Sequence, residues 1–342
     1  MTTTTRPTTA AQQFALRRHS PLRRVQHVLH AHPAISPFLV LIVSFVVFAT
    51  VNPRFASPNS LSLVLQQVAV IGALAVGQTL IIITAGIDLS VGAIAILAMM
   101  LSARLAEGQG LPGVLAILLA IAVGAVAGAL NGALVTRLKL PPFIVTLGTL
   151  SVFTAVGLLY SGGQSVQATD LPPVLSWTGE SFPVGPFRIT AGVVAVVLLY
   201  LVVGYALART AWGRHVYAVG DDKEAARLAG IRVDRVLLSV YLVAGAIYGL
   251  TAWILIGRAG AASPNAVTDA NLESITAVVI GGTSLFGGRG AVLGTLLGAL
   301  IVGFFRSGLS LAGVDDHYRV LAVGLLVILA VAVDQWIRKV KA

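Results

Sequence analysis

The sequence contains no cysteine and has few charged residues. Because the chain has no thiol, disulfide bonds, thiolate metal sites and a cysteine nucleophile are all excluded. Charged residues make up 11% of the 342 residues and hydrophobic residues 57%, whereas an ordinary soluble domain averages about 25% charged residues. This composition excludes an ordinary soluble domain.

Long apolar runs fill most of the chain instead. Several approach the roughly 20 residues that cross a bilayer as a helix, whereas a membrane β-barrel would alternate polar and apolar residues in short segments. We therefore predict an all-α, polytopic membrane protein with about ten transmembrane helices, some of them interrupted. The predicted spans are Pro37–Val51, Leu61–Thr84, Leu89–Leu105, Gly113–Thr136, Phe143–Tyr160, Ile189–Ala208, Val236–Ile256, Leu272–Ile280, Ala291–Leu311 and Val320–Ile337.

The basic residues are concentrated on one side of the predicted membrane. The chain has 23 lysine and arginine residues against 13 acidic residues, a net charge of +10. With a cytoplasmic N-terminus, most of the basic residues fall on the cytoplasmic side, as the positive-inside rule prefers. We expect both termini to be cytoplasmic, and we attribute the basic charge to membrane topology rather than to binding of nucleic acid.

The chain divides into a short tail and a membrane domain. Residues 1–34 are rich in threonine and basic residues, and they lack the apolar core and cleavage site of a signal peptide. We predict that they form a disordered cytoplasmic tail, and that residues 35–338 form the transmembrane domain. Within it, residues 161–188 are rich in proline, glycine and serine, and we predict an irregular loop on the outer side.

A polar segment, Trp212–Val233, separates two of the long apolar runs. Asp221 followed by Glu224 is typical of the capping box that begins a helix. Good helix formers follow, and Gly230 stands where a left-handed C-cap would end the helix. The sequence therefore predicts a cytoplasmic helix of about two turns inside this segment.

This predicted helix has one small, apolar face, formed by Ala225, Leu228 and Ala229. A helix of about two turns is marginally stable in water by itself. Two interpretations remain open at this point. The segment is either a solvated loop between membrane helices or a helix that a partner protein holds.

Glycines recur at every fourth position in two of the predicted spans. Such ridges let helix backbones approach closely in lipid, so we expect tight packing within the subunit or across a dimer; lining of a moving pathway is the alternative. The two ridges consist of Gly124, Gly128 and Gly132 in the fourth predicted span, and of Gly290, Gly294 and Gly298 at the start of the ninth.

Two glycine-bracketed stretches, Ile83–Ala93 and Val279–Ala291, are typical of interrupted membrane helices. Irregular backbone at membrane depth survives where protein or a water-filled cavity satisfies it, and broken helices are common at transport sites. Asp88 is a functional candidate because it is ionisable; alternatively it is the N-cap of the third span. The pathway and gating candidates are Gly86, Asp88, Ser90, Gly92, Asn131, Gly281, Gly282, Thr283 and Ser284.

Polar chemistry elsewhere in the spans is sparse. The polar side chains of Gln66, Gln67, Gln78 and Asn131 could hydrogen-bond a polyhydroxylated solute or a neighbouring helix. Arg306 is unusual because a central arginine is costly in a membrane. His215 and His317 lie in predicted loops without ligand-like neighbours, so we predict no metal site and no catalytic residue. No phosphate-binding loop is present, so any energy that the protein uses must come from an ion gradient or from a partner.

Four segments resemble the ribose-type permeases of ABC importers. They are GIDLSVG (86–92), PPFIVTLGTL (141–150), YAVGDDKEAARLAGI (217–231) and AVVIGGTSLFGGRG (277–290). The resemblance runs from about residue 35 to residue 338, and it implies a bacterial inner-membrane permease that imports a monosaccharide such as ribose, xylose, arabinose or galactose. It also implies a second permease subunit in a homodimer or heterodimer, a cytoplasmic ABC ATPase that carries ATP and Mg, and an extracytoplasmic sugar-binding protein. The chain itself would carry no cofactor and catalyse no reaction.

EAARLAG (224–230) is similar to the cytoplasmic loop through which these permeases dock on their ATPase, here within residues 209–235. The resemblance implies that the docking residues are Asp222, Glu224, Ala225, Ala226, Leu228, Ala229 and Gly230. Residues 161–188 and 258–271 are candidates for contact with the binding protein. Ala85 departs from the family pattern because a second glycine usually stands there, and Asn271 departs because an acidic residue often precedes the matched Glu273.

Three other functions remain open from the sequence. A permease for branched-chain amino acids or nucleosides is the nearest, because such permeases share the docking loop. A gradient-driven secondary transporter would work without an ATPase. A membrane enzyme is disfavoured, because no catalytic constellation is present.

Overall fold

The computed structural model describes residues 35–338 with the exception of residue 268. The predicted basic tail, residues 1–34, lies outside the described residues. The described chain is mostly helical, as the sequence predicted. Its α-helices are α3 Ile35–Val51, α4 Pro58–Ile83, α5 Val91–Gln109, α6 Gly113–Arg137, α7 Pro142–Ser161, α8 Pro173–Ser176, α9 Ala191–Arg209, α10 Ala211–Asp221, α11 Lys223–Leu228, α12 Val233–Ala259, α13 Ala270–Ile280, α14 Val292–Leu311 and α15 Asp316–Arg338.

Seven described helices are long and apolar enough to cross a membrane: α4, α5, α6, α7, α9, α12 and α14. α3 and α13 are shorter apolar helices of 17 and 11 residues, and α15 has 23 residues. Each of the ten predicted spans therefore corresponds to a helix. The chain is a multi-pass membrane protein.

Short elements connect the long helices. Residues 161–188 were predicted to be irregular, but they contain β1 Val166–Gln167, the 3-10 helices η2 Ala168–Asp170 and η3 Trp177–Gly179, α8, and β2 Ser181–Val184, which leads into β3 Phe187–Thr190. β1 pairs with β4 Ala261–Ala262, and β2 pairs with β3, both antiparallel. The prediction of an irregular loop was therefore wrong, because these short pairings satisfy backbone groups that the loop composition alone did not reveal.

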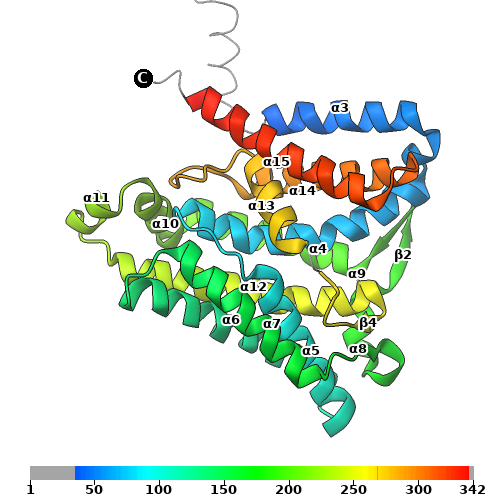
Figure 1. The fold of residues 1–342 in the computed structure, drawn as a ribbon, viewed down its shortest axis with the longest axis horizontal. Helices are drawn as coiled ribbons and strands as arrows, with labels where there is room; N and C mark the ends of the chain where they lie inside the picture. The colour runs from blue at the N-terminus through cyan, green and yellow to red at the C-terminus, as the bar shows by residue number, and fades with distance from the viewer. Residues whose placement is uncertain (1–34, 268, 339–342) are drawn as a thin grey trace, which may run out of the picture.

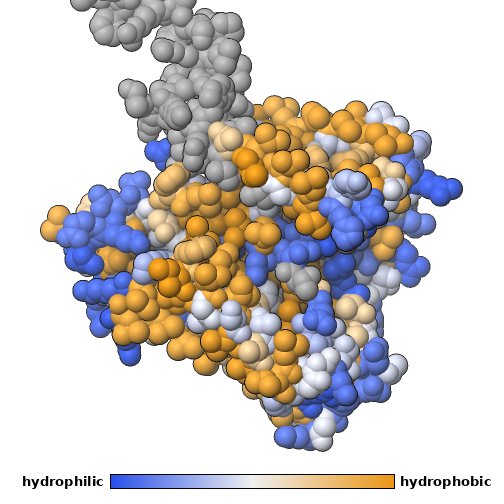
Figure 2. Space-filling view, viewed as in Figure 1, coloured by the Kyte–Doolittle hydropathy of each residue, from blue (hydrophilic) through white to orange (hydrophobic). Residues whose placement is uncertain are grey.

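The long helices run roughly along one direction and leave two distinct ends (Figure 1). α10 and α11 lie at one end, while the β2–β3 hairpin, α8 and β4 lie at the other. Figure 2 shows hydrophobic residues over the middle of this face and hydrophilic residues gathered toward both ends. Large apolar side chains such as Val126 and Leu159, 70% and 83% exposed, suit a surface that faces lipid.

α6 and α12 pack closely through glycines on both helices. A Cβ atom added at Gly124 would lie 2.2 Å from the carbonyl oxygen of Gly245, and one added at Gly128 would lie 2.1 Å from that of Tyr241. Gly132 faces the Tyr241 side chain at a tighter-than-usual 3.0 Å. The first glycine ridge therefore packs within the subunit.

The second ridge is split by the start of α14. Gly294 and Gly298 lie on α14 and face the backbone of Gly281 and Ala277. Gly290 was predicted to belong to the same helix ridge, but it precedes α14 and has a φ of +145°. That backbone conformation favours glycine and is incompatible with a helix, so the spacing of four residues was misleading there.

The glycine contact between α6 and α12 generates the first prediction. Gly128→Ala should destabilise the protein by about 1–3 kcal/mol or more, the typical cost of overpacking a core. The new methyl group would meet backbone atoms, which cannot move aside as a flexible side chain can. Gly148→Ala on α7 is the matched control, since no atom lies within 4 Å of its added Cβ. The control should be neutral or gain up to about 1 kcal/mol of helix propensity. Thermal unfolding of the purified proteins in detergent measures both, and equal effects would contradict this packing.

Ala85 generates the second prediction. It has a φ of +59°, in the left-handed region, which costs a residue with a Cβ about 1–2 kcal/mol. Ala85→Gly should therefore stabilise the protein by up to about 1 kcal/mol, after the greater freedom of glycine in the unfolded chain is subtracted. Ala312→Gly is the control and should lower the stability, because Ala312 is the C-cap residue of α14 and has a φ of −75°. If Ala85→Gly lowers the melting temperature as much as Ala312→Gly does, the strain is absent.

Candidate functional site

The polar segment between α9 and α12 folds into two short helices, at a hydrophilic end of the molecule (Figures 1 and 2). The sequence predicted one helix that begins at Asp221, but Asp221 is the last residue of α10, and Asp222 is the N-cap of α11. Asp222 Oδ1 accepts hydrogen bonds from the backbone N–H groups of Glu224 at 2.8 Å and Ala225 at 3.0 Å. The predicted start was wrong by one residue because Thr210 caps a preceding helix that the sequence analysis did not recognise.

The predicted capping box is not formed. Glu224 instead pairs with Arg227 at 2.7 Å, and both side chains are more than half exposed, so the pair contributes little stability. The end of the helix agrees with the prediction. Gly230 has a φ of +84°, and the backbone N–H of Ile231 donates to the carbonyl of Ala226 at 3.0 Å, as in a left-handed C-cap.

α11 turns its small, apolar face away from the rest of the chain. Leu228 is 83% exposed, whereas Ala226 is 5% exposed and points back into the chain. Ala225 and Ala229 are also exposed. A helix of six residues has little stability of its own, so α11 presents an apolar face that the described chain leaves uncovered. Of the predicted docking residues, Ala226 is therefore the one that supports the helix from within.

The first interrupted stretch joins α4 to α5 through a buried polar chain. Asp88 Oδ1 accepts from the backbone N–H of Ser90 at 2.7 Å and from its hydroxyl at 2.6 Å. Asn131 of α6 donates from Nδ2 to the Ser90 hydroxyl oxygen at 2.9 Å. All three side chains are buried. The structure thus brings together three of the predicted pathway residues.

The interpretation of Asp88 as N-cap needs correction. Ser90, which directly precedes α5, is the N-cap, and its side chain makes no capping hydrogen bond. The backbone N–H of Gly92 instead donates at 2.8 Å to Oδ1 of Asn271, in the first turn of α13. Asp88 precedes the N-cap by two residues and orients Ser90 through the two hydrogen bonds that it accepts from it. The start of α5 is therefore held by a residue of the other interrupted helix, which the sequence could not show.

The second interrupted stretch is a glycine-rich turn between α13 and α14. Gly281 packs against the backbone of Gly294, and Gly282 has a φ of +84°. The buried hydroxyl of Thr283 has no hydrogen-bond partner among the described residues, while Ser284 Oγ accepts from the backbone N–H of Phe286 at 3.1 Å. α13 ends at Ile280, where the predicted eighth span also ends.

α10 touches both interrupted stretches. A Cβ atom added at Gly220 would lie 1.8 Å from the carbonyl oxygen of Ile83 and 2.7 Å from the backbone nitrogen of Gly288. The Gly288 N–H itself donates to that Ile83 oxygen at 2.9 Å. The Tyr217 hydroxyl donates to the carbonyl oxygen of Gly290 at 2.8 Å. The helix next to α11 is thereby fixed to the end of α4 and to the turn before α14.

Arg306, which the sequence singled out as costly, forms a salt bridge with Glu273 of α13. The Glu273 side chain is 7% exposed and that of Arg306 is 41% exposed. A buried carboxylate needs such a partner. Among the residues that the structure describes, no three His, Asp or Glu side chains are grouped to hold a metal ion.

Sequence reasoning missed Tyr217, Gly220, Asn271 and Glu273 as members of these contacts. Tyr217 and Gly220 lie inside the segment that resembles the ribose-type permeases, so position alone could have drawn attention to them. Gly290, the hydrogen-bond partner of Tyr217, lies 73 residues further along the chain, and no local sequence pattern encodes such a contact.

Comparison with known proteins agrees with this architecture. The fructose import permease protein FrcC of Rhizobium meliloti is 50% identical over 325 residues, which cover 94% of this chain and 90% of the relative. The ribose import permease proteins RbsC of Bacillus subtilis (strain 168) and Escherichia coli (strain K12) are 38% and 37% identical, covering 88% and 86% of this chain and 92% of each relative. No solved structure matches the chain.

The profile of one protein family matches residues 60–331. The matched range extends from the first turn of α4 into α15 and so contains both interrupted stretches, α10 and α11. The chain therefore belongs to the family described as "Branched-chain amino acid transport system / permease component".

Proposed function

We propose that this protein is the transmembrane permease subunit of an ABC importer, which moves a monosaccharide into the cell with ATP hydrolysed by a separate subunit. The observation that carries the proposal is α11, a helix of six residues with a leucine 83% exposed at a hydrophilic end of the molecule. An exposed apolar anchor on a short, capped helix suits insertion into a groove of a partner protein.

The contacts of α10 support a route for the motion of the partner. A displacement of α11 would move α10. The backbone of α10 at Gly220 directly contacts the backbone at the end of α4 and at the Gly288 turn, with no side chain between them. Both interrupted helices would then shift together against the glycine-packed pair α6 and α12. Such rigid-body rearrangement of one part of the bundle against another is how alternating access is commonly achieved.

The same proposal specifies the other partners and the location. A second permease subunit, identical or homologous, would complete the pathway in the bacterial inner membrane. A cytoplasmic ABC ATPase would hold ATP and Mg, and an extracytoplasmic sugar-binding protein would meet residues 161–188 and 258–271. The docking region, residues 209–235, and both termini would be cytoplasmic, in accordance with the distribution of basic residues.

The proposed substrate class is supported by the substrates for which the relatives of this chain are named. The family description mentions branched-chain amino acids, yet FrcC and both RbsC proteins are named for fructose or ribose import. Identity of 37–50% over nearly the whole chain favours a sugar over an amino acid or a nucleoside. Uptake of labelled D-fructose, D-ribose and L-leucine by proteoliposomes that contain the permease, its ATPase and its binding protein distinguishes them. Uptake of a sugar alone supports the proposal, and uptake of leucine alone contradicts it.

A gradient-driven transporter is the second candidate function, because polar side chains within the membrane domain would also suit it. The reconstituted chain without ATPase, given a proton or sodium gradient, should show no uptake. Uptake under those conditions would overturn the requirement for an ATPase.

The docking face generates the third prediction. Leu228→Glu should abolish co-purification with the ATPase and lower ATP-driven uptake at least about tenfold, since loss of a central apolar anchor costs roughly 2 kcal/mol or more of binding free energy. The protein itself should remain folded because Leu228 is exposed. Leu138→Glu is the matched control, as Leu138 is 62% exposed at the end of α6. If the two variants lose the ATPase equally, docking is not localised on α11.

The hydrogen bond from Tyr217 to Gly290 generates the fourth prediction. Tyr217→Phe removes one hydrogen bond, worth about 0.5–1.5 kcal/mol, without altering α11. The complex should assemble and hydrolyse ATP, while the amount of solute transported per ATP falls roughly two- to tenfold. Tyr205→Phe on the exposed face of α9 is the control and should leave this ratio unchanged. A ratio that is unaffected in Tyr217→Phe would show that α10 does not transmit motion through this contact.

A further inference from the structure

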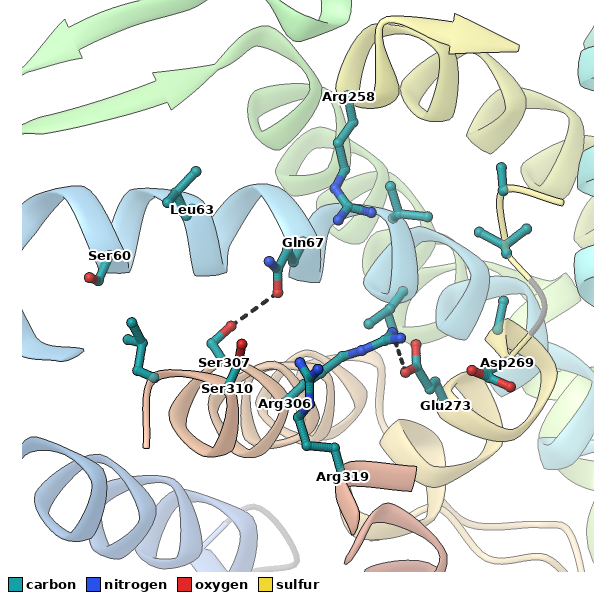
Figure 3. Close-up of a pocket in the computed structure, with 16 residues that line it drawn as sticks. Ser60, Leu63, Gln67, Arg258, Asp269, Glu273, Arg306, Ser307, Ser310 and Arg319 are labelled. Carbon is teal, nitrogen blue, oxygen red and sulfur yellow. Dashed lines mark hydrogen bonds and ion pairs between the residues drawn. The ribbon is translucent and has the colours of Figure 1, made fainter. Parts of the chain in front are cut away.

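A cavity of about 430 Å³ lies among α4, α12, α13 and α14 (Figure 3). The first half of α4, the last turns of α12 and α14 and the start of α13 surround it. α12 begins five residues after α11 and reaches this cavity at Arg258, about 38 Å along the helix axis at 1.5 Å per residue. With α11 in the cytoplasm, this cavity lies toward the outer side.

Two of the polar contacts in the cavity have a structural role. The buried carboxylate of Glu273 requires Arg306 as its partner, and this salt bridge ties α13 to α14. Ser307 Oγ donates to Oε1 of Gln67 at 3.0 Å, which ties α14 to α4. These contacts account for the position of the helices around the cavity.

Three polar groups that border the same space make no hydrogen bond within the described part of the chain, although the charge of Arg258 also acts on Glu273. The side chains of Arg258 and Asp269 make no hydrogen bond or salt bridge with any described residue, nor does the amide nitrogen of Gln67, and Arg258 points from α12 into the cavity (Figure 3). Arginine offers five N–H donors, the aspartate two acceptor oxygens and the amide two further donors. A polyhydroxylated molecule could use donors and acceptors together, because each hydroxyl group both donates and accepts.

The size and the charges of the cavity restrict its occupant. Small-molecule sites commonly measure about 300–1,000 Å³, so this cavity has room for a monosaccharide. Charged side chains of both signs line it: Arg258, Arg306 and Arg319 together with Asp269 and Glu273. A small anion would be repelled by the two carboxylates and a small cation by the arginines, whereas a neutral solute would experience neither electrostatic repulsion. Leu63 and Ile71 add apolar surface for the C–H groups of a sugar ring.

We propose that this cavity is a weak outer binding site for the transported monosaccharide, in which Arg258, Asp269 and Gln67 hydrogen-bond the sugar hydroxyls. The inference rests on the proposed function as a sugar permease. In this proposal the sugar occupies the cavity before it passes toward the buried, hydrogen-bonded side chains of Asp88, Ser90 and Asn131. A transport intermediate requires release as well as binding, so dissociation constants of about 1 mM or above are expected.

The absence of cysteine allows a direct test. In the permease–ATPase complex reconstituted without the binding protein, Ser310→Cys places one thiol at the cavity, because Ser310 is exposed and lines it. D-fructose or D-ribose, whichever the importer transports, should slow reaction of this thiol with a charged thiol reagent, about twofold at a concentration equal to Kd. Combining Ser310→Cys with Arg258→Gln or with Asp269→Asn should remove this protection while the rate without sugar stays the same. Thr169→Cys, an exposed residue of η2, is the control and should react equally with and without sugar.

The outcomes separate this inference from the proposed function. If the importer transports the sugar but the sugar never slows labelling of Ser310→Cys, even well above the transport KM, the cavity is not a sugar site and the function stands. If the sugar slows labelling only after the binding protein is added, the cavity is a docking surface for that protein and not a sugar site, and the inference is overturned. If the complete importer transports no sugar, both the function and the inference fall.

Discussion

The close approach of Gly220 to the backbone of Ile83 and Gly288 is the constraint on which the rest of the account depends. A Cβ atom at Gly220 would overlap the Ile83 carbonyl oxygen at 1.8 Å, so only glycine allows α10 to lie there. The Gly288–Ile83 hydrogen bond and the Tyr217–Gly290 hydrogen bond join the same three segments. A helix end, a glycine-rich turn and the support of the docking helix thus form one rigid contact. Without it, α10 would no longer connect α11 with the two interrupted stretches.

α13 extends this connection across the molecule. Its C-terminal end runs into the glycine-rich turn that α10 contacts, and its N-terminal turn carries Asn271, which holds the start of α5, and Glu273, which borders the outer cavity. The helix has 11 residues and is therefore about 16 Å long. A shift of this helix would change the outer cavity and the first interrupted stretch at the same time. The short length that excludes α13 from the usual spanning helices is thus consistent with a part that moves as a unit between two sites.

Local physical rules made much of this structure predictable. Hydropathy located every long helix, and the preference of glycine for positive φ located the end of α11 at Gly230. The same rules failed where the outcome depended on residues far apart in sequence. Spacing placed Gly290 on a helix, although the turn beside Thr283 imposes a φ of +145° there. The sequence showed Arg306 as a costly charge but could not show that Glu273 neutralises it, and it revealed one glycine ridge of the α6–α12 contact without Gly245 on the facing helix. Asp221 was chosen over Asp222 because two adjacent aspartates fit a cap almost equally well, and only the preceding α10 decides between them.

The central claim is that α11, α10 and the turn before α14 move as one body when the partner binds ATP. Spin-label distance measurements in the cysteine-free chain test it with two pairs of labelled cysteines. The first pair is Lys223→Cys with Arg289→Cys, from α11 to the turn, and the second is Leu138→Cys with Arg289→Cys, from the end of α6 to the turn. In the reconstituted importer, addition of ATP should leave the first distance unchanged and alter the second. A first distance that changes while the second stays fixed would contradict the account.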